Sequence, residues 1–424
     1  MKEQEEYPMK MLTRMLAAVL ALVMLALPAL AETTPEDVLA TVNGIPVTRA
    51  AYELELRMLQ DEYAAYGYDV TDEMIAEVLQ QMAMLTCVEY ALLEEKLISE
   101  NLQLSDEEKA DAAQDAREYW QMNVDDALAY YGVTDETPEE ERAAVLLQIL
   151  AGFEADGYTE ESFINEAITF AGYEKVWQWA VKDVNVPEEE VRAYYDELVA
   201  ADQVAYANDV NAYETMQDNN QMYLIFGMTD YYVDLYYMPE GYRQVTHILL
   251  TVDDAVQEAY NALAADPAAD PAALEAARAA VVADVQPTLD EINALMEAGE
   301  TFASLIPLYT EDPGMSDAVT IEEGYLVHPL STKWVTEFRD AAFSVDQPGD
   351  ITAPVVTAHG VHVIQYVADM PGGPAPYTDD VRALLLEELL NGRQAAAYNA
   401  AVTMWMDEAE VVYAQEMQEL MSGL

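Results

Sequence analysis

The stretch VTHILL, residues 245–250, alternates polar and apolar side chains and then becomes fully apolar, which predicts a buried β-strand carrying one histidine. A second β-rich stretch, PVVTAHGVHVIQY, occupies residues 354–366. The chain has four histidines, and three of them lie in these two stretches. We therefore expect the two strands to be neighbours in one small sheet, where His247 and His362 meet.

The composition limits both the architecture and the partners. At 424 residues the chain is long enough for two or three domains, and with 52% hydrophobic residues it can bury real cores. There are 18 Lys and Arg against 80 Asp and Glu, a net charge of −62. Nucleic acid is excluded as a partner, because binding it requires clustered basic residues that replace the phosphate counterions. Anionic membrane surfaces should repel the protein, and cationic partners are favoured.

The sequence predicts neither a metal site nor a cofactor. It contains no EF-hand spacing, H-E-x-x-H motif, Gly-rich phosphate loop or Ser-His-Asp arrangement. His328, His359 and His362 come nearest to a ligand set, but positions 359 and 362 of one strand would face opposite sides of the sheet. The single cysteine, Cys87, excludes an intrachain disulfide and lies in a helical pattern that predicts a buried thiol.

The start of the chain predicts export. Residues 15–31, MLAAVLALVMLALPALA, are short for a membrane-spanning helix and end in the A-x-A pattern of signal-peptide cleavage. We expect a signal peptide over residues 1–31, cleaved after Ala31, and an extracytoplasmic, secreted or cell-surface protein. The glutamates that follow Met1 do not suit the basic start of such a segment, whereas a start at Met9 does. An uncleaved membrane anchor is the alternative.

Residues 32–240 predict a helical lobe. Residues 42–48, VNGIPVT, predict a short strand and turn leading into a helix capped by Thr48. Capping boxes begin at Ser105 and Thr137, where the first side chain caps the helix and a glutamate three residues later reaches back. Apolar spacing and these caps predict helices over residues 49–66, 72–100, 106–131, 138–156, 160–182 and 187–213.

Residues 204–240 are rich in Tyr, Asn and Met, with the pairs Tyr231-Tyr232 and Tyr236-Tyr237. An aromatic stripe of this kind is commonly part of a core. Because the stretch ends at a predicted domain boundary, an exposed surface that contacts client proteins is the alternative interpretation.

Residues 241–372 carry six short motifs in a fixed order. They are His-Ile-Leu at 247–249, Gly-x-x-Phe at 299–302, Tyr-x-x-Asp at 309–312, Glu-Phe-x-x-Ala-Ala-Phe at 337–343, Pro-Gly-Asp-Ile at 348–351 and Thr-x-x-Gly-x-His-x-Ile at 357–364. In this order they resemble the parvulin-type peptidyl-prolyl isomerases, and with the signal segment and helical lobe the whole chain resembles the exported foldases of the PrsA and SurA kind. The resemblance implies an α+β fold, with a mostly helical chaperone lobe and an inserted parvulin domain in which helices flank a small antiparallel sheet.

The last predicted segment, residues 373–424, follows the linker PGGP at residues 371–374. Apolar residues recur at helical spacing from Tyr377 to Met406, and an amphipathic helix of this length needs a partner surface. The resemblance implies that this helix returns to pack on the N-terminal lobe.

The resemblance also assigns roles to individual residues. The implied catalytic residues are His247, Asp312, Thr357 and His362, and the implied substrate-binding residues are Leu326, Trp334, Phe338 and His359. The family motif Gly-Asp-Leu-Gly becomes Gly-Tyr-Leu-Val at residues 324–327, with Tyr325 in place of Asp and Val327 in place of the second Gly.

Rotation about an Xaa-Pro bond needs no nucleophile, because no covalent bond breaks. The barrier, roughly 18–20 kcal/mol, comes from amide resonance, which places negative charge on the carbonyl oxygen. An apolar pocket would favour the less charge-separated twisted bond, and the Asp312 carboxylate would repel charge on a nearby carbonyl oxygen. From the residues alone, plainer interpretations stay open: structural roles for His247 and His362, a turn role for Asp312, and ordinary core packing for Trp334 and Phe338.

The sequence therefore predicts a foldase that isomerises Xaa-Pro bonds in unfolded or newly exported proteins, without a cofactor or covalent intermediate. The alternative is a holdase chaperone with weak or no catalysis, an interpretation that the departures at Tyr325 and Val327 favour. A surface adhesin or scaffold would leave the ordered motifs unexplained. Membrane contact is expected only through an uncleaved signal segment, and a homodimer is compatible with the sequence.

Overall fold

The computed structural model describes residues 37–155, 158–316 and 318–422. The chain divides into two compact units, of which the first contains residues up to Asn185 together with those from Leu389 onward. The second unit contains residues 186–388. The predicted domain boundaries after residues 240 and 372 differ from these limits and stay a prediction. The expected signal peptide, residues 1–31, lies outside the described residues.

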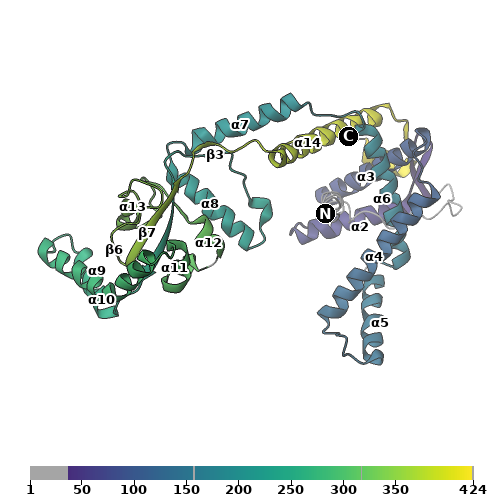
Figure 1. Cartoon of the computed structure of the whole chain (residues 1–424). Coiled ribbons are helices and arrows are strands. Elements are labelled where there is room, and N and C mark those ends of the chain that lie inside the picture. Colours follow the sequence, from purple (N-terminus) through teal and green to yellow (C-terminus); the bar gives the residue numbers. More distant parts are fainter. Residues whose placement is uncertain (1–36, 156–157, 317, 423–424) are drawn as a thin grey trace. The chain divides into compact units, whose positions relative to one another are not determined.

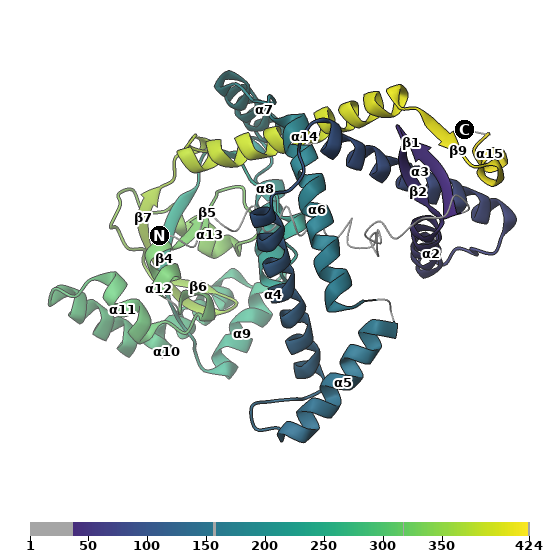
Figure 2. The same cartoon turned by 90° about the vertical axis from the view of Figure 1, so that its right-hand side faces the viewer.

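The first unit contains a small antiparallel sheet (Figure 2). Strands β1 (Val38–Val42) and β2 (Ile45–Thr48) form a hairpin around the predicted turn, whose residues Asn43 and Gly44 have φ angles of 49° and 88°. Asn and Gly tolerate this left-handed backbone, which suits a two-residue hairpin turn. A third strand, β9 (Val411–Tyr413), pairs with β1 and is not evident in the sequence pattern.

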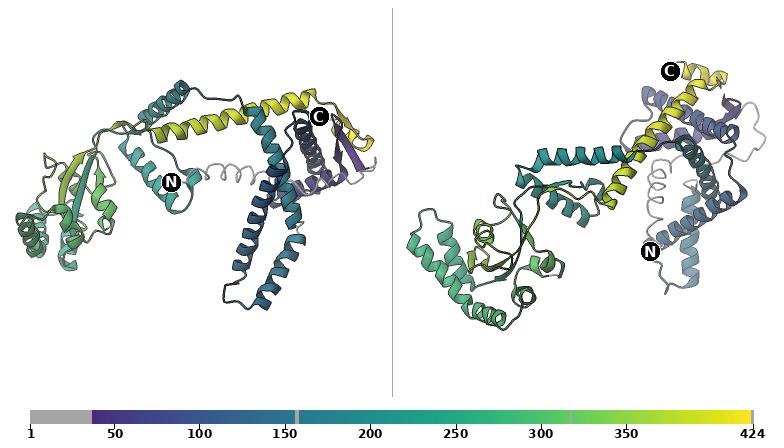
Figure 3. Two further views of the ribbon diagram at one scale, coloured as in Figure 1. Left: turned by 45° about the vertical axis from the view of Figure 1, so that its right-hand side comes forward. Right: turned by 45° about the horizontal axis from the view of Figure 1, so that its top comes forward.

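Helices make up most of the first unit. They are α2 (Arg49–Ala65), α3 (Glu73–Ser99), α4 (Asp106–Tyr130), α5 (Glu139–Ala155), α6 (Glu160–Val181) and α15 (Gln415–Met421). The side chains of Thr48 and Ser105 cap α2 and α4 as the sequence predicts, and the side chain of Thr159 caps α6. The predicted capping box at Thr137 is wrong, because its hydroxyl instead accepts from the backbone N–H of Thr134 at 2.9 Å. Figures 1 and 3 show α4 and α5 side by side as a helical hairpin.

The core of the first unit forms around α3. Buried side chains of this helix, including Met84 and Leu92, pack in one cluster with Trp405 of α14 (Asp379–Glu408) and Met417 of α15. The C-terminal segment thus shares a core with the N-terminal helices. Burial raises the pKa of the Cys87 thiol to about 12, so the thiol is inert at neutral pH. Within the described ranges, no helix is both long enough and apolar enough to cross a membrane.

The second unit begins with two helices, where the sequence predicts one over residues 187–213. The single helix is wrong, because the side chain of Asp209 accepts from the backbone N–H of Ala212 and starts a new helix. The elements of this segment are α7 (Glu188–Tyr206), α8 (Val210–Ile225), η2 (Thr229–Tyr231) and β3 (Tyr237–Met238). Strand β3 pairs with β8 (Gly373–Pro374), so the predicted linker takes part in a two-stranded sheet.

A four-stranded antiparallel sheet in the order β5-β4-β7-β6 lies at the centre of the second unit. Its strands are β4 (Arg243–Leu250), β5 (Tyr325–Val327), β6 (Val355–Thr357) and β7 (Gly360–Asp369). Residues 354–366 are therefore a hairpin and not one strand, and His359 lies in the turn. Gly360 has a φ of 134°, and a Cβ there would overlap the carbonyl oxygen of Leu250, so the turn requires glycine.

Helices cover both faces of this sheet (Figure 1). They are α9 (Asp254–Ala264), α10 (Pro271–Glu297), α11 (Phe302–Tyr309), α12 (Ala318–Glu323) and α13 (Thr336–Ala342), with the short η3 (Pro313–Met315). Ile248 and Val363 pack in one cluster with side chains of α9, α10 and α11, whereas Val245 and Ile364 pack with α13. The expected fold, mostly helical with a small antiparallel sheet, is confirmed.

Candidate active site

The register between β4 and β7 brings the two sheet histidines together. His247 lies opposite Ile364 and Leu249 lies opposite His362, so both imidazoles stand on the same face of the sheet. The rings stack with centroids 5.1 Å apart, and their Nδ1 atoms are 3.1 Å apart. Both side chains are buried. The prediction that His247 and His362 meet in one sheet is confirmed.

A chain of hydrogen bonds runs through this pair from Thr357 to Asp312. Thr357 Oγ1 lies 2.9 Å from His362 Nε2, and His247 Nε2 lies 2.6 Å from Asp312 Oδ2. An ionised carboxylate only accepts, so His247 Nε2 carries the proton of that contact. With one proton on each ring, His362 donates from Nδ1 to His247 Nδ1 and accepts the Thr357 hydroxyl proton at Nε2. Every donor in the chain then points toward Asp312.

Asp312 is held as a carboxylate by three donors. Besides His247, the Tyr325 hydroxyl donates to Oδ2 at 2.9 Å, and the Gly314 backbone N–H donates to Oδ1 at 3.1 Å. The hydrogen bond from His247 has the largest effect, and together the donors outweigh partial burial and lower the pKa of Asp312 to about 2. The side chain is therefore negatively charged throughout the physiological pH range.

Burial acts on His362 in the direction that keeps it neutral. Loss of hydration, followed by the neighbouring His247 and His359, lowers the pKa of His362 to about 3. A neutral imidazole donates from one nitrogen and accepts at the other. This state agrees with the direction of the hydrogen-bond chain from Thr357 to Asp312.

Three aromatic rings cover the histidine pair. Phe338 contacts the rings of His247 and His362 edge to face, with centroid distances of 5.1 and 5.2 Å. Trp334 stacks on Phe338 at 5.5 Å, and Tyr325 packs against Trp334 at 5.0 Å. Phe338 is only 2% exposed, whereas Trp334 is partly exposed. Tyr325 is partly exposed as well, so of the stacked pair Trp334 and Phe338 it is Trp334 that is accessible from outside.

The same part of the chain matches a known family. Residues 247–368 match the model of the rotamase family, described as the PPIC-type PPIASE domain. These residues form a parvulin-type rotamase domain. The match begins at His247 and extends beyond His362, so the whole hydrogen-bond chain lies inside the rotamase domain.

Relatives of the chain include foldases. The Foldase protein PrsA of Clostridium perfringens is 22% identical over 267 residues, which cover 63% of this chain and 58% of that protein. The chain thus spans 58% of the length of this relative. The Foldase protein PrsA of a Geobacillus species is 36% identical over 78 residues, 18% of this chain and 26% of that protein.

Solved structures with similarity include PrsA of Bacillus subtilis. It has 17% identity and a TM-score of 0.20, covering 92% of this chain and 99% of that one. A SurA-like chaperone of Campylobacter jejuni has 18% identity and a TM-score of 0.28, covering 69% of this chain and 95% of that one.

The structure does not bring the side chain of Leu326 to the aromatic stack of the rotamase domain. Successive residues of a strand point to opposite faces, so Leu326 points away from the face that carries Tyr325. Its side chain packs in the cluster of Tyr242 instead. The carbonyl oxygen of Leu326 does contribute, because it accepts from Trp334 Nε1 at 3.1 Å.

The substrate-binding role expected of His359 stays a prediction. It lies in the β6–β7 turn with its side chain exposed. Its backbone N–H donates to Thr357 Oγ1 at 3.0 Å, so this residue helps to orient the hydroxyl at the start of the hydrogen-bond chain.

Tyr325 is the residue of the rotamase domain that sequence reasoning left without a role. Its hydroxyl binds Asp312, and its ring contacts both His247 and Trp334. The signal was present in the sequence, since Tyr325 stands where the resembled motif has Asp. Its partner could not be inferred, because Asp312 approaches only in the folded sheet.

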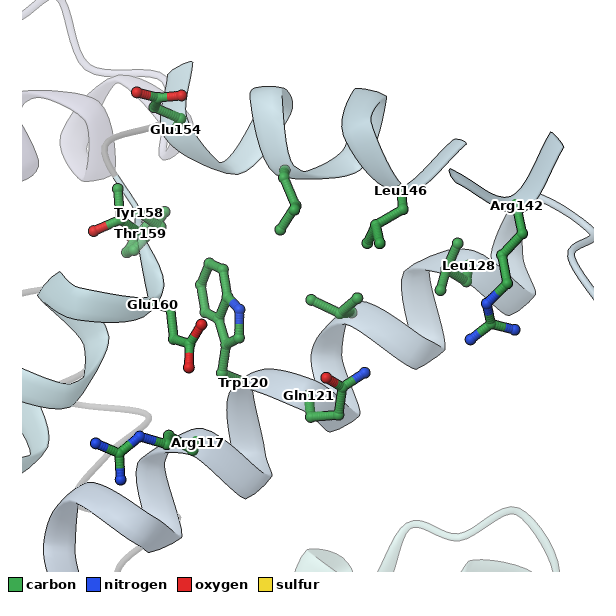
Figure 4. Close-up of a pocket in the computed structure, with 12 residues that line it drawn as sticks. Arg117, Trp120, Gln121, Leu128, Arg142, Leu146, Glu154, Tyr158, Thr159 and Glu160 are labelled. Carbon is green, nitrogen blue, oxygen red and sulfur yellow. The ribbon is translucent and has the colours of Figure 1, made fainter. Parts of the chain in front are cut away.

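The first unit contains a cavity of about 480 Å³ between α4 and α5, and none of its lining residues belongs to the rotamase domain (Figure 4). Trp120, Leu128 and Leu146 form its apolar wall, and Arg117 and Arg142 lie on its lining. No predicted site residue lines this cavity. In the described part of the chain, no group of three or more His, Cys, Asp or Glu side chains gathers so that it could hold a metal ion.

Proposed function

We propose that this chain is an extracytoplasmic foldase whose rotamase domain isomerises Xaa-Pro bonds in unfolded, exported proteins. The observation that carries the proposal is the hydrogen-bond chain from Thr357 to Asp312 beneath the stacked rings of Trp334 and Phe338. The match of residues 247–368 to the rotamase family supports the reaction. The foldase relatives and the expected signal peptide support action on exported proteins.

Trp334 is the proposed contact for the proline ring. Its indole is fixed by the hydrogen bond to the carbonyl of Leu326 and by stacking on Phe338, so it offers a rigid apolar face. In the twisted amide less charge is separated than in the planar one. Surroundings that exclude water therefore stabilise the twisted bond relative to the planar bond.

Asp312 acts as a fixed negative charge and not as a proton donor. A general acid or base works best when its pKa lies near the working pH, and the pKa of Asp312 is lowered to about 2. A carboxylate held near the carbonyl oxygen that precedes proline would oppose charge on that oxygen. This weakens the amide resonance that creates the barrier.

His247 and His362 are proposed as positioning residues. Both are buried, and their ring nitrogens contact one another, Asp312 and Thr357. They fix the direction in which the Asp312 carboxylate points. In this role they need not touch the substrate.

A protease-coupled assay on an Xaa-Pro peptide tests the proposal. The wild-type chain should accelerate isomerisation. Asp312→Asn and His247→Ala should each lower kcat/KM by about tenfold or more, because the first removes the preorganised charge and the second removes the hydrogen bond that orients it. Glu337→Gln, an exposed carboxylate on the neighbouring helix α13, is the matched control and should leave kcat/KM unchanged. If the folded wild-type chain gave only the uncatalysed rate, the proposed isomerase activity would be refuted.

A holdase chaperone is the second candidate function, and the closed state of the aromatic stack favours it. Phe338 is buried beneath Trp334, so a proline ring cannot reach Phe338 without displacing Trp334. A holdase would suppress aggregation of an unfolded protein, measured by light scattering, as well in Asp312→Asn as in the wild type. Isomerase activity that Asp312→Asn abolishes would favour the foldase.

A further inference from the structure

A segment of the second unit exposes many large apolar side chains outside the rotamase domain. Residues 222–233, here called the apolar loop, comprise the last turn of α8, the short helix η2 and the residues around it, and they lead toward β3 (Figure 1). Ile225 is 71% exposed and Phe226 is 70% exposed. Leu224, Tyr231, Tyr232 and Val233 are also exposed. Soluble proteins seldom gather so many exposed apolar side chains in a short segment unless the surface binds a partner.

The apolar loop is held in shape by two sets of hydrogen bonds. Asn220 is buried, donates to the carbonyl oxygen of Val233 at 2.6 Å and accepts from the Val233 N–H at 3.0 Å. At the other end, Gly227 has a φ of 67° and the Met228 N–H donates to the Tyr223 carbonyl, which ends α8 in a left-handed cap. The two ends are therefore tied, and the exposure of the apolar side chains is a property of an ordered loop.

The charged residues of the apolar loop and of its neighbours along the chain are all acidic. The sequence has no Lys or Arg between Arg192 and Arg243, whereas Asp230 and Asp234 lie in or beside the loop and are exposed. Asp218 on α8 pairs with Lys333 at 2.6 Å, which satisfies that cation. A basic partner would gain from the uncompensated carboxylates, and an acidic partner or an anionic lipid surface would be repelled.

We propose that the apolar loop binds basic, apolar segments of unfolded polypeptide, whether or not they contain proline. This rests on the proposed foldase function and names the class of client segment that the chain selects. The exposed side chains around Ile225 and Phe226 provide the apolar contact. Asp230 and Asp234 provide the preference for Lys and Arg.

Three proline-free, dye-labelled peptides of equal length test the proposal by fluorescence anisotropy with the full chain. The first alternates Leu and Phe with Lys, the second replaces Lys with Glu, and the third keeps Lys but replaces Leu and Phe with Ser. The first peptide should bind, and the other two should bind about tenfold more weakly or not at all, since each lacks one of the two contributions.

Variants separate the loop from the rest of the surface. Ile225→Ser with Phe226→Ser should weaken binding of the first peptide by about tenfold or more, because two large side chains lose their apolar contact. The control, Leu147→Ser with Val204→Ser, removes two apolar side chains that are 69% and 88% exposed elsewhere on the chain, and it should bind as the wild type does. Asp230→Asn with Asp234→Asn should reduce the preference for the Lys peptide over the Glu peptide at low salt.

The isomerase assay on a short Xaa-Pro peptide distinguishes peptide binding by the apolar loop from catalysis by the rotamase domain. The Ile225 and Phe226 variant should retain the wild-type isomerase rate, because neither residue belongs to the rotamase domain. Peptide binding that depends on the loop supports the proposal even if the isomerase rate is zero. Equal binding of all three peptides, or equal binding by the loop variant and the control, overturns it. Sedimentation could also show that the wild type and the control are dimers and that the Ile225 and Phe226 variant is a monomer. That result would assign the loop to contact with a second copy of the chain and would also overturn the proposal.

Discussion

The hydroxyl group of Tyr325 occupies the space that a β-carbon on Gly314 would need. The same hydroxyl donates to Asp312 Oδ2, and the Gly314 N–H donates to Asp312 Oδ1. The two residues therefore hold one carboxylate from two sides. The missing side chain at position 314 is what lets the hydroxyl reach it.

Gly314→Ala should lower the isomerase activity by displacing the Tyr325 hydroxyl from Asp312. In a Tyr325→Phe background the same alanine should cost much less, because the nearest ring carbon, Cζ, lies 3.3 Å from the Cβ position. A double-mutant cycle on kcat/KM measures this coupling. Gly152→Ala is the control, since a Cβ there meets nothing within 4 Å. Additive effects of the two substitutions would show that the hydroxyl does not need the space at Gly314.

Tyr325→Phe should raise the pKa of Asp312 from its value of about 2. Losing a hydrogen bond to a charged group shifts the pKa by about one unit, so the protonated form appears at higher pH. The acid limb of kcat/KM should move up by that amount, and the ¹³C shift of the Asp312 carboxyl group should titrate with it. Tyr130→Phe, an exposed tyrosine of the first unit, should leave both unchanged.

Trp334 and Phe338 should respond to alanine in different ways. Phe338→Ala removes a buried ring and should destabilise the second unit by about 3–5 kcal/mol, measured by denaturant unfolding. Trp334→Ala should mainly lower kcat/KM, because the ring is partly exposed and is the proposed contact for proline. Trp334→Phe should restore part of the activity by keeping an aromatic face. Full activity in Trp334→Ala would show that Trp334 does not contact the substrate.

The two units should respond to pH in opposite directions. The pKa of His362 is lowered from 6.5 to about 3, so between these values the unfolded chain binds the extra proton and the second unit loses stability as pH falls. Burial, and then Glu62, raises the pKa of Glu55 from 4.5 to about 7. Between these values the folded state binds the extra proton, so the first unit loses stability as pH rises.

Pulse proteolysis between about pH 4.5 and 7 checks these opposite trends. Fragments assigned to each unit report how much of that unit is unfolded at each pH. Glu55→Gln should flatten the pH dependence of the first unit and leave that of the second unchanged. His362→Gln should flatten the second and leave the first unchanged. The same trend in both units would show that these two groups do not dominate the pH dependence.

Much of the fold was predictable because its signals are local. Helix caps such as Ser105 and Thr159 act within one turn, and the Asn43-Gly44 pair defines its own hairpin. The prediction of one helix over residues 187–213 failed on a local signal as well. Asp209 is a good N-cap residue, and it starts the second of the two helices found there. Strand β9 could not be predicted from the sequence, because three residues are too few to show a periodicity and their partner β1 lies at the other end of the chain.

The sequence by itself determined that two strands carry the rare histidines and that six ordered motifs mark a rotamase domain. Only the tertiary structure decided which side chains meet there. The pleat of β5 turns Tyr325 toward His247 and Leu326 away from it. Folding also brings three hydrogen-bond donors to the Asp312 carboxylate, and these donors keep it ionised. Periodicity and caps depend on neighbours in the chain, whereas strand register and electrostatics depend on residues that become neighbours only in the folded protein.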